Sequence, residues 1–278
     1  MHLKIDNVKF GYSSVPVLND VCLELEGAQF VSIIGPNGVG KSTLIHCINK
    51  ILSPTGGVVT INGDDVKDIP LKELAKRVGY VPYSSSDSFP LTVVDTVLMG
   101  RHPHSKWGSF DNDLKVTDET LELMGIKHLS MRIFNELSAG QVQKVMLARG
   151  LVQEPQILLL DEPTSNLDIK HQIEVTKILR NLSHEKEILV IIISHDLNIA
   201  AKYADKMILM HDGGIYSVGT PDEVITEENL KVVYGVSSRI IRDKDRPHII
   251  LEDSIDLIKE EKYTISAEEG TSAFYEEV

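Results

Sequence analysis

The 278-residue sequence has few cysteines and no long apolar run. Cys22 and Cys47 are too few for a disulfide framework and lack the paired spacing of a zinc site, so a reducing compartment is expected. The longest apolar run, Ile188 to Ile193, is far shorter than the roughly 20 residues that cross a bilayer. Met1 to Asp6 are not expected to begin a signal peptide. Any membrane role is therefore expected to come through a partner.

Basic residues are also scarce, because 28 lysines and arginines stand against 41 acidic residues, a net charge of −13. This field repels a phosphate backbone and argues against nucleic-acid binding by bulk charge. Much of the excess is local, since residues 252 to 278 hold nine acids against Lys259 and Lys262. Such a run is usually a solvated segment, and a regulatory or partner-binding tail is the alternative. The chain is 42% hydrophobic, which is enough for a buried core.

Short apolar strands alternate with helical patterns along the chain. Strands are predicted at residues 3–10, 17–25, 30–34, 58–61, 157–160, 188–194 and 206–210. Helices are predicted after Lys41 and at residues 93–100, 113–124, 141–152, 171–182 and 197–203. The first 65 residues are mostly strands and turns, and residues 83–153 form a helical insertion. The later alternation predicts an α/β fold with a buried, mostly parallel sheet.

A glycine-rich segment follows the predicted strand at residues 30–34 and leads into a helix, as a phosphate-binding loop requires. Glycines allow backbone N–H groups to converge on phosphate oxygens. Lys41 can reach the β- and γ-phosphates of ATP, and the Ser42 hydroxyl can bind Mg²⁺. The alternative is an ordinary glycine-rich turn. The predicted nucleotide-binding residues are Gly35, Pro36, Asn37, Gly38, Val39, Gly40, Lys41, Ser42 and Thr43.

Two adjacent carboxylates, Asp161 and Glu162, follow the apolar strand at residues 157–160. In an open parallel sheet, ligands bind at the carboxyl ends of the strands, which predicts Asp161 near Mg²⁺. Neighbouring side chains on a strand point in different directions, so Glu162 is predicted to orient a water as general base. A solvated strand end would be the more common explanation without the phosphate-binding loop upstream.

The stretch Leu137-Ser138-Ala139-Gly140-Gln141 completes a resemblance to the ATP-binding cassette (ABC) ATPases, which carry L-S-G-G-Q here. The resemblance covers residues 1–240, the expected ATPase domain, and leaves residues 241–278 as a C-terminal extension with the acidic tail. It implies a phosphate-loop core, an N-terminal antiparallel β subdomain and an inserted α-helical subdomain. It also implies a head-to-tail homodimer, in which the signature of one subunit, Ser138, Ala139, Gly140 and Gln141, completes the ATP site of the other.

Further positions match this family one by one. Tyr12 lies where an aromatic ring stacks on adenine, although it could instead pack on its own sheet. Asp168 ends Ser165-Asn166-Leu167-Asp168, which looks like the loop that communicates across the dimer. His195 follows the strand at residues 188–194, where the family has a histidine that contacts the γ-phosphate, so Lys41, Glu162 and His195 are the expected catalytic residues.

Three positions depart from the family pattern. Tyr83 stands where the family has a glutamine that contacts Mg²⁺ and the attacking water, and a phenol supplies no amide oxygen. Ala139 replaces a glycine, and Lys144 stands where arginine is usual. ATP hydrolysis is still expected, and an ATP-dependent dimerisation module with weak hydrolysis is the alternative.

Residues 89–104 closely resemble the helical region of the ATPase subunits of importers for iron-siderophore complexes, haem and cobalamin. A second resemblance to this importer branch runs through residues 195–201, 219–224 and 233–236. The resemblance implies two integral membrane subunits, an indirect extracytoplasmic substrate-binding protein, and a place on the cytoplasmic face of the membrane. Iron chelate is ranked first among the cargoes. A soluble cassette of DNA repair or translation is disfavoured, because the sequence has neither a long coiled-coil insertion nor a second cassette.

Overall fold

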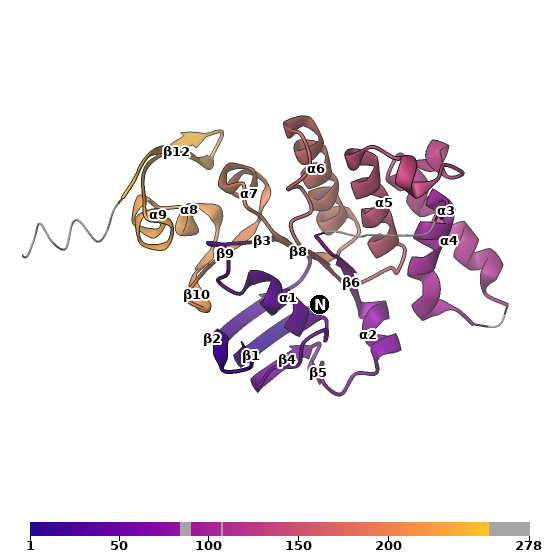
Figure 1. Cartoon of the computed structure of the whole chain (residues 1–278), viewed down its shortest axis with the longest axis horizontal. Coiled ribbons are helices and arrows are strands. Elements are labelled where there is room, and N and C mark those ends of the chain that lie inside the picture. The colour runs from indigo at the N-terminus through magenta and orange to yellow at the C-terminus, as the bar shows by residue number, and fades with distance from the viewer. Residues whose placement is uncertain (84–89, 107, 256–278) are drawn as a thin grey trace, which may run out of the picture.

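The computed structural model describes residues 1–83, 90–106 and 108–255. In that part of the chain the strands form a six-stranded, a four-stranded and a two-stranded sheet. Figure 1 shows the four-stranded sheet below the six-stranded one, with a helical region at one end of the molecule and the two-stranded hairpin near the other. Of the predicted acidic tail, residues 252–278, the part from residue 256 onwards lies outside the described residues, and residues 252–254 belong to the last strand.

The six-stranded sheet has the order β10-β9-β3-β8-β7-β6, and all neighbours are parallel except β9 and β10. Every residue of β3, β7 and β8 is buried, as expected for strands covered on both faces. The strands are β3 (Phe30–Ile34), β6 (Val78–Val81), β7 (Ile157–Leu160), β8 (Leu189–Ile193), β9 (Lys206–His211) and β10 (Gly214–Gly219). The predicted mostly parallel α/β core is confirmed.

The four-stranded sheet is antiparallel with the order β2-β1-β4-β5. Its strands are β1 (His2–Tyr12), β2 (Val15–Glu26), β4 (Gly56–Ile61) and β5 (Asp64–Asp65). Alternate residues of β1 and β2, such as Leu3, Ile5 and Leu23, are buried. They share a core with β3 and with α1 (Lys41–Ile48), so α1 is packed between the two sheets (Figure 1).

The chain between the neighbouring strands β6 and β7 forms the helical region. It contains α3 (Val93–Leu98), η1 (Met99–His104), α4 (Phe110–Leu123), η2 (Lys127–Leu129), η3 (Phe134–Glu136) and α5 (Ala139–Leu151). Its apolar side chains join the core on the face of the sheet opposite α1, together with α6 (Ile169–Glu185) and α7 (Leu197–Tyr203). The chain therefore leaves the sheet after β6 and returns to it at β7, so both ends of the helical insert are attached to neighbouring strands.

Sequence patterns missed the short helix α2 (Leu71–Arg77) and most of the C-terminal elements. These are α8 (Pro221–Val224), α9 (Glu227–Tyr234), β11 (Val236–Asp243) and β12 (Arg246–Ser254). The expected domain boundary at residue 240 falls inside β11, whose hairpin with β12 packs on α7 and α9. No helix in the described ranges is long and apolar enough to cross a membrane.

A buried ion pair joins η1 to α4 and to the end of α5 within the helical region. Arg101 of η1 donates from Nε to Asp113 Oδ1 at 2.9 Å and from Nη1 to the Val152 carbonyl at 2.7 Å. The Arg101 and Asp113 side chains are only 5% and 8% exposed. We expect Arg101→Ala to lower the free energy of unfolding by about 3 to 5 kcal/mol, because it leaves a buried carboxylate unpaired. Urea denaturation measures this change.

The exposed pair between Lys127 and Asp118, at 2.7 Å, provides the control for that measurement. Lys127→Ala should cost less than about 1 kcal/mol, since water and salt screen such a pair. Equal losses for the two alanine variants would show that Arg101 contributes no more than a surface charge.

Candidate nucleotide-binding site

Three neighbouring strands bring the predicted catalytic residues together. In the order β3-β8-β7, the phosphate-binding loop follows β3, Ser194 and His195 follow β8, and Asp161 and Glu162 follow β7. The strands run parallel, so their carboxyl ends lie at one edge of the sheet. The backbone N–H of Asp161 donates to the Val81 carbonyl at 3.0 Å, which extends the pairing of β7 with β6 to the first carboxylate.

The phosphate-binding loop depends on glycine at specific places. Gly40 has a φ of 103°, and a Cβ there would lie 2.8 Å from Leu18 Cδ2. Gly35 has a φ of 146°, and a Cβ there would lie 2.4 Å from the Met210 carbonyl oxygen. Both positions combine a backbone conformation unusual for other residues with insufficient space for a side chain. Glycine at these two positions lets the loop backbone adopt this conformation, in which its N–H groups can approach phosphate oxygens.

Lys41 is the cation of this loop. It is 6% exposed, and its Nζ donates to the carbonyls of Gly35 and Pro36, both at 2.7 Å. Burial lowers the pKa of Lys41, while the Glu162 and Asp161 carboxylates raise it, with a net lowering. Two loop carbonyls thus hold the ammonium group in place, close enough to Asp161 and Glu162 for their charges to act on it.

Ser42 and Asp161 form an oxygen-rich pair beside it. The Ser42 hydroxyl donates to Asp161 Oδ1 at 3.1 Å. Burial raises the pKa of Asp161, and the neighbouring Glu162 raises it further, against the lowering effects of Ser42, His46 and Lys41. A buried carboxylate beside a second carboxylate gains from an additional cation. A hydroxyl and a carboxylate are also donors that Mg²⁺ prefers, so the donor set fits that ion.

Glu162, the second carboxylate, contacts His195. Its Oε1 lies 2.5 Å from His195 Nε2, and its Oε2 accepts a hydrogen bond from the Ser165 hydroxyl at 3.0 Å. Glu162 has a φ of 48°, a left-handed conformation that is uncommon outside glycine. Such strain persists where the surrounding structure fixes a functional side chain. The structure thus gives the two adjacent carboxylates different partners.

The signature residues lie at the start of α5. The Ser138 side chain caps this helix by accepting from the Gln141 N–H, and the Gln141 side chain accepts from the Ser138 N–H at 3.1 Å. A Cβ on Gly140 would lie 2.8 Å from the ring of His171 on α6. Asp168 caps α6 and accepts from the N–H and Nδ1 of His171 at 2.9 and 2.7 Å. The signature is therefore packed close to Asp168 within one subunit.

Tyr12 lies at the end of β1 and is 53% exposed. Its ring packs edge-on against the ring of Phe10 on the same strand, with the two centroids 5.0 Å apart. Val15, Pro16, Val17 and Asn19 at the start of β2, together with Pro36 to Val39 and His211 to Gly213, line a hollow of about 410 Å³. This hollow adjoins the phosphate-binding loop and has room for a nucleoside.

Tyr83 follows β6 by two residues and is 49% exposed. Residues 84–89 after it are outside the described part of the chain. The phenol of Tyr83 is thus not buried in the core. Its role in hydrolysis stays a prediction.

Two residues near the carboxylates escaped the sequence analysis. His46 Nε2 and the Tyr80 hydroxyl lie 3.0 Å apart, on α1 and β6. The separation of His46 from Ser42 by one helical turn was a signal that it faces the same way as Ser42. The position of Tyr80 became visible only with the strand order. Ser165 was included in a loop but not connected with Glu162.

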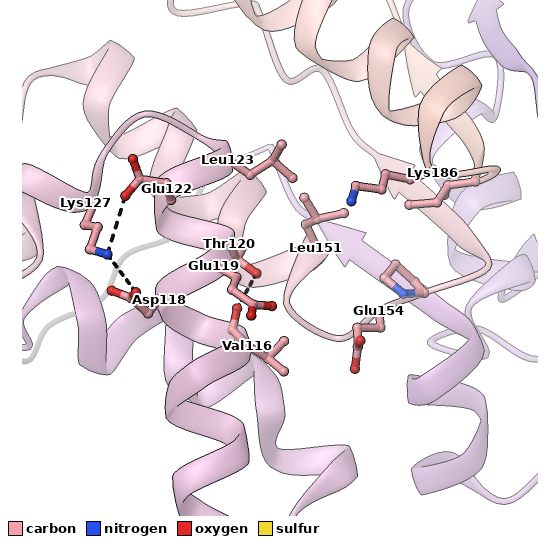
Figure 2. A pocket seen from close by; sticks show the side chains of 12 residues that line it. Val116, Asp118, Glu119, Thr120, Glu122, Leu123, Lys127, Leu151, Glu154 and Lys186 are labelled. Atoms are coloured by element: carbon pink, nitrogen blue, oxygen red, sulfur yellow. Dashed lines mark hydrogen bonds and ion pairs between the residues drawn. The ribbon is translucent and has the colours of Figure 1, made fainter.

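A cavity of about 640 Å³ lies away from this site, at the amino ends of β7 and β8 (Figure 2). Figure 2 shows Asp118 and Glu122 directed toward Lys127, which pairs with them at 2.7 and 3.5 Å. Glu154 pairs with Arg101 at 2.7 Å. These carboxylates serve as ion-pair partners, and the cavity is separate from the phosphate-binding loop.

A phosphate-binding loop after β3 and a carboxylate pair after β7 define the class of P-loop ATPases. The family model described as ABC transporter matches residues 18–165. The chain belongs to the ABC transporter family as an ATP-binding, ATPase subunit.

Three curated relatives support this membership. An uncharacterised ABC transporter ATP-binding protein of Methanocaldococcus jannaschii is 48% identical and covers 90% of this chain and 98% of its own length. The hemin import ATP-binding protein of Escherichia coli O157:H7 is 36% identical, covering 90% and 99%. The ferric enterobactin transport ATP-binding protein of Escherichia coli K12 is 35% identical, covering 87% and 90%. Two of these relatives are thus named for the transport of iron compounds.

Solved structures are also similar. An inward-facing metal-chelate type ABC transporter, itself described as putative, matches with a TM-score of 0.78 and 28% identity, covering 90% of this chain and 96% of that one. A dimeric ATP-binding cassette bound to ADP and Pi in a post-hydrolysis state matches with a TM-score of 0.69 and 29% identity, covering 78% and 98%. The predicted cassette fold, with its antiparallel sheet and helical insert, is confirmed.

Proposed function

We propose that two copies of this chain close around two ATP molecules and energise a membrane importer of metal chelates. The observation that carries the proposal is the division between the two carboxylates after β7. Asp161 accepts from Ser42 at 3.1 Å, while Glu162 contacts His195 at 2.5 Å. One carboxylate is suited to bind a cation and the other to take a proton, as hydrolysis requires.

Ser42 and Asp161 would hold Mg²⁺, since the hydroxyl and the buried carboxylate offer oxygen donors in a site that already favours positive charge. When bound, Mg²⁺ neutralises charge on the phosphate oxygens. Lys41 and the loop N–H groups would bind the phosphates beside it. Holding the phosphates in place lowers the entropic cost of the reaction.

Glu162 would orient a water molecule and accept its proton. His195 and Ser165 hold its two carboxylate oxygens, which limits rotation of the side chain. His195 is 39% exposed, so it can also reach a phosphate oxygen from the side of β8. Tyr12 would stack on the adenine beside the hollow next to the phosphate-binding loop.

The signature of a second copy would complete each site. Ser138 and Gly140 lie at the start of α5, where the N–H groups of Ala139 and Gly140 and the positive end of the helix dipole favour an anion, while the capping box uses the N–H groups of Ser138 and Gln141. The similar cassette bound to ADP and Pi is a dimer, which supports a pair of copies, and the head-to-tail arrangement follows from the sequence resemblance. Asp168, packed close to the signature, would then lie near the dimer contact.

The membrane partners would be two integral membrane subunits, with a substrate-binding protein acting outside the cytoplasm. The relatives named for ferric enterobactin and hemin transport, at 35% and 36% identity, support siderophore-bound iron and haem without ranking them. Siderophore-bound iron is placed first on the sequence resemblance. Cobalamin is the third cargo that the sequence resemblance implies. The chain would work at the cytoplasmic face of the membrane, bound to these subunits rather than inserted itself.

Co-purification from membranes tests the partners. A tagged copy should retain two membrane subunits, and its ATPase activity in that complex should rise when the cargo-loaded binding protein is added. Retention of DNA or ribosomal components instead would contradict the importer function. A chain that hydrolyses ATP and retains no membrane subunit would contradict the coupling while leaving the ATPase assignment intact.

Tyr83 favours a second candidate, a cassette that dimerises on ATP but hydrolyses it slowly. Its phenol cannot supply the amide oxygen that the family places here, and it is 49% exposed rather than packed. We expect Tyr83→Gln to raise turnover severalfold, since one well-placed hydrogen bond is worth about 0.5 to 1.5 kcal/mol. ATP affinity should change little, because Lys41 and the loop bind the phosphates.

Turnover and nucleotide affinity of both forms, measured with the membrane subunits present, check this prediction. Tyr83→Phe is the control, since it keeps the ring and removes only the hydroxyl. If the glutamine variant is equally active or slower, Tyr83 is an adapted residue and the slow-hydrolysis candidate loses its support.

A further inference from the structure

A histidine and a tyrosine lie beside Asp161, outside the groups given a role above. His46 Nε2 lies 3.0 Å from the Tyr80 hydroxyl. Their rings meet edge-on, with centroids 5.7 Å apart and an angle of 85° between the planes. Both side chains are partly buried. This geometry joins α1 to β6 through one hydrogen bond and one ring contact.

Secondary-structure periodicity explains why this pair adjoins the carboxylate. Ser42 and His46 are four residues apart on α1, so they share one face of the helix. Tyr80 pairs with Leu159, and Asp161 is two residues beyond Leu159, so Tyr80 and Asp161 lie on the same face of the sheet. That face packs on α1. Asp161 therefore meets Ser42, and Tyr80 meets His46.

Each of these two hydrogen bonds connects α1 to the paired strands β6 and β7. The apolar residues of α1 pack between the two sheets, and the bond from Ser42 to Asp161 adds one polar contact to that packing. His46 lies about 6 Å further along the helix axis, given a rise of about 1.5 Å per residue. Two polar contacts this far apart constrain the direction of the helix relative to the sheet more tightly than one does.

The surrounding charges favour a persistent bond. Burial raises the pKa of Tyr80 to about 12, and the Asp161 carboxylate adds to that rise. The phenol therefore keeps its proton at neutral pH and can donate to the imidazole. The groups acting on Asp161 are Ser42, Glu162, His46 and Lys41. His46 thus lies close enough to influence the carboxylate while its Nε2 is bound to Tyr80.

We propose that His46 and Tyr80 are positioning residues for the Mg²⁺ end of the nucleotide site. Their hydrogen bond holds α1 in place on β6 and β7, which keeps Ser42 and Asp161 within reach of one cation. Neither residue touches the nucleotide in this role. The inference rests on the proposed Mg²⁺ site at Ser42 and Asp161. It adds that the hydrogen bond between His46 and Tyr80 supports this site.

Binding of a fluorescent ATP analogue, measured with Mg²⁺ and again with EDTA, tests the proposal. Tyr80→Phe keeps the ring and removes the hydroxyl, and His46→Leu removes the ring nitrogens. Each variant should weaken binding with Mg²⁺ by roughly 3- to 10-fold, the range expected for one hydrogen bond, and leave binding in EDTA unchanged. The Mg²⁺ concentration for half-maximal binding should rise by a similar factor.

Three further variants separate positioning from packing. His46→Gln offers an amide at similar reach and should restore most of the Mg²⁺-dependent affinity. The double variant should lose no more than either single variant, because both remove the same bond. Tyr216→Phe is the matched control, since Tyr216 meets His211 edge-on at 6.0 Å in a similar ring contact and should bind like the wild type.

Several results would overturn the inference. Unchanged binding by Tyr80→Phe would do so, as would equal weakening with Mg²⁺ and with EDTA, which would indicate a general structural effect. If the wild type itself shows no Mg²⁺ dependence, the proposed metal site fails together with this contact. If the wild type depends on Mg²⁺ and the variants do not differ from it, only the positioning role fails.

Discussion

Lys41→Ala is expected to abolish detectable ATP hydrolysis. The Lys41 ammonium donates to two loop carbonyls and would turn these bonds toward the β- and γ-phosphates in the nucleotide complex. Losing two charge-assisted hydrogen bonds of about 1.5 to 3 kcal/mol each corresponds to a fall of roughly 10²- to 10⁴-fold. Phosphate release at saturating ATP and nucleotide binding by calorimetry measure the two parts of the effect.

Two controls separate the charge from the packing of this side chain. Lys41→Met keeps most of the apolar stem and should be as inactive as the alanine variant, because only the charge is needed. Lys115→Ala removes a lysine that is 73% exposed on α4 and should leave hydrolysis unchanged. ATPase activity in Lys41→Ala equal to that of the wild type would refute the assignment of the phosphate-binding loop.

Glu162→Gln is expected to retain ATP affinity and to slow turnover by roughly 10²- to 10⁴-fold, the usual contribution of a positioned general base. The amide can still accept a hydrogen bond from Ser165, so the side chain should stay in place while it loses the ability to take a proton. Because hydrolysis no longer opens the site, a dimer with bound ATP should accumulate. Size-exclusion chromatography with ATP and Mg²⁺ detects this dimer.

Glu24→Gln provides a matched control for that substitution, since Glu24 is 55% exposed on the antiparallel sheet. This variant should hydrolyse ATP like the wild type and should not accumulate a dimer. A Glu162→Gln protein that stays monomeric with ATP and Mg²⁺ would count against the shared site. A variant with full turnover would remove Glu162 from the chemistry.

The core of the nucleotide site was predictable because its signals are local in the sequence. Gly35 to Thr43 directly follow a buried strand, and so do Asp161 and Glu162. Each signal needs only a strand, a turn and the residue types that the chemistry demands. The strands at 30–34 and 157–160 were predicted with their observed bounds, since an uninterrupted apolar run between turn residues leaves little choice.

The C-terminal elements were less predictable for a physical reason. The helix α8 has four residues, and β11 and β12 mix polar with apolar side chains without regular alternation on a partly exposed hairpin. Short or exposed elements carry little periodic signal, and packing on α7 and α9 decides their conformation. Similarly, α4 begins at Phe110 rather than at the predicted residue 113, since the first turn depends on local contacts.

The sequence by itself determined the phosphate-binding loop, the two carboxylates, the class of fold and the family resemblance. Only the tertiary structure decided which partners those groups have. The contacts of Glu162 with His195, and of His46 with Tyr80, join segments 33 to 34 residues apart. Such contacts depend on strand order and on which face of α1 lies against the sheet, and these follow from burying the whole core at once rather than from any local pattern.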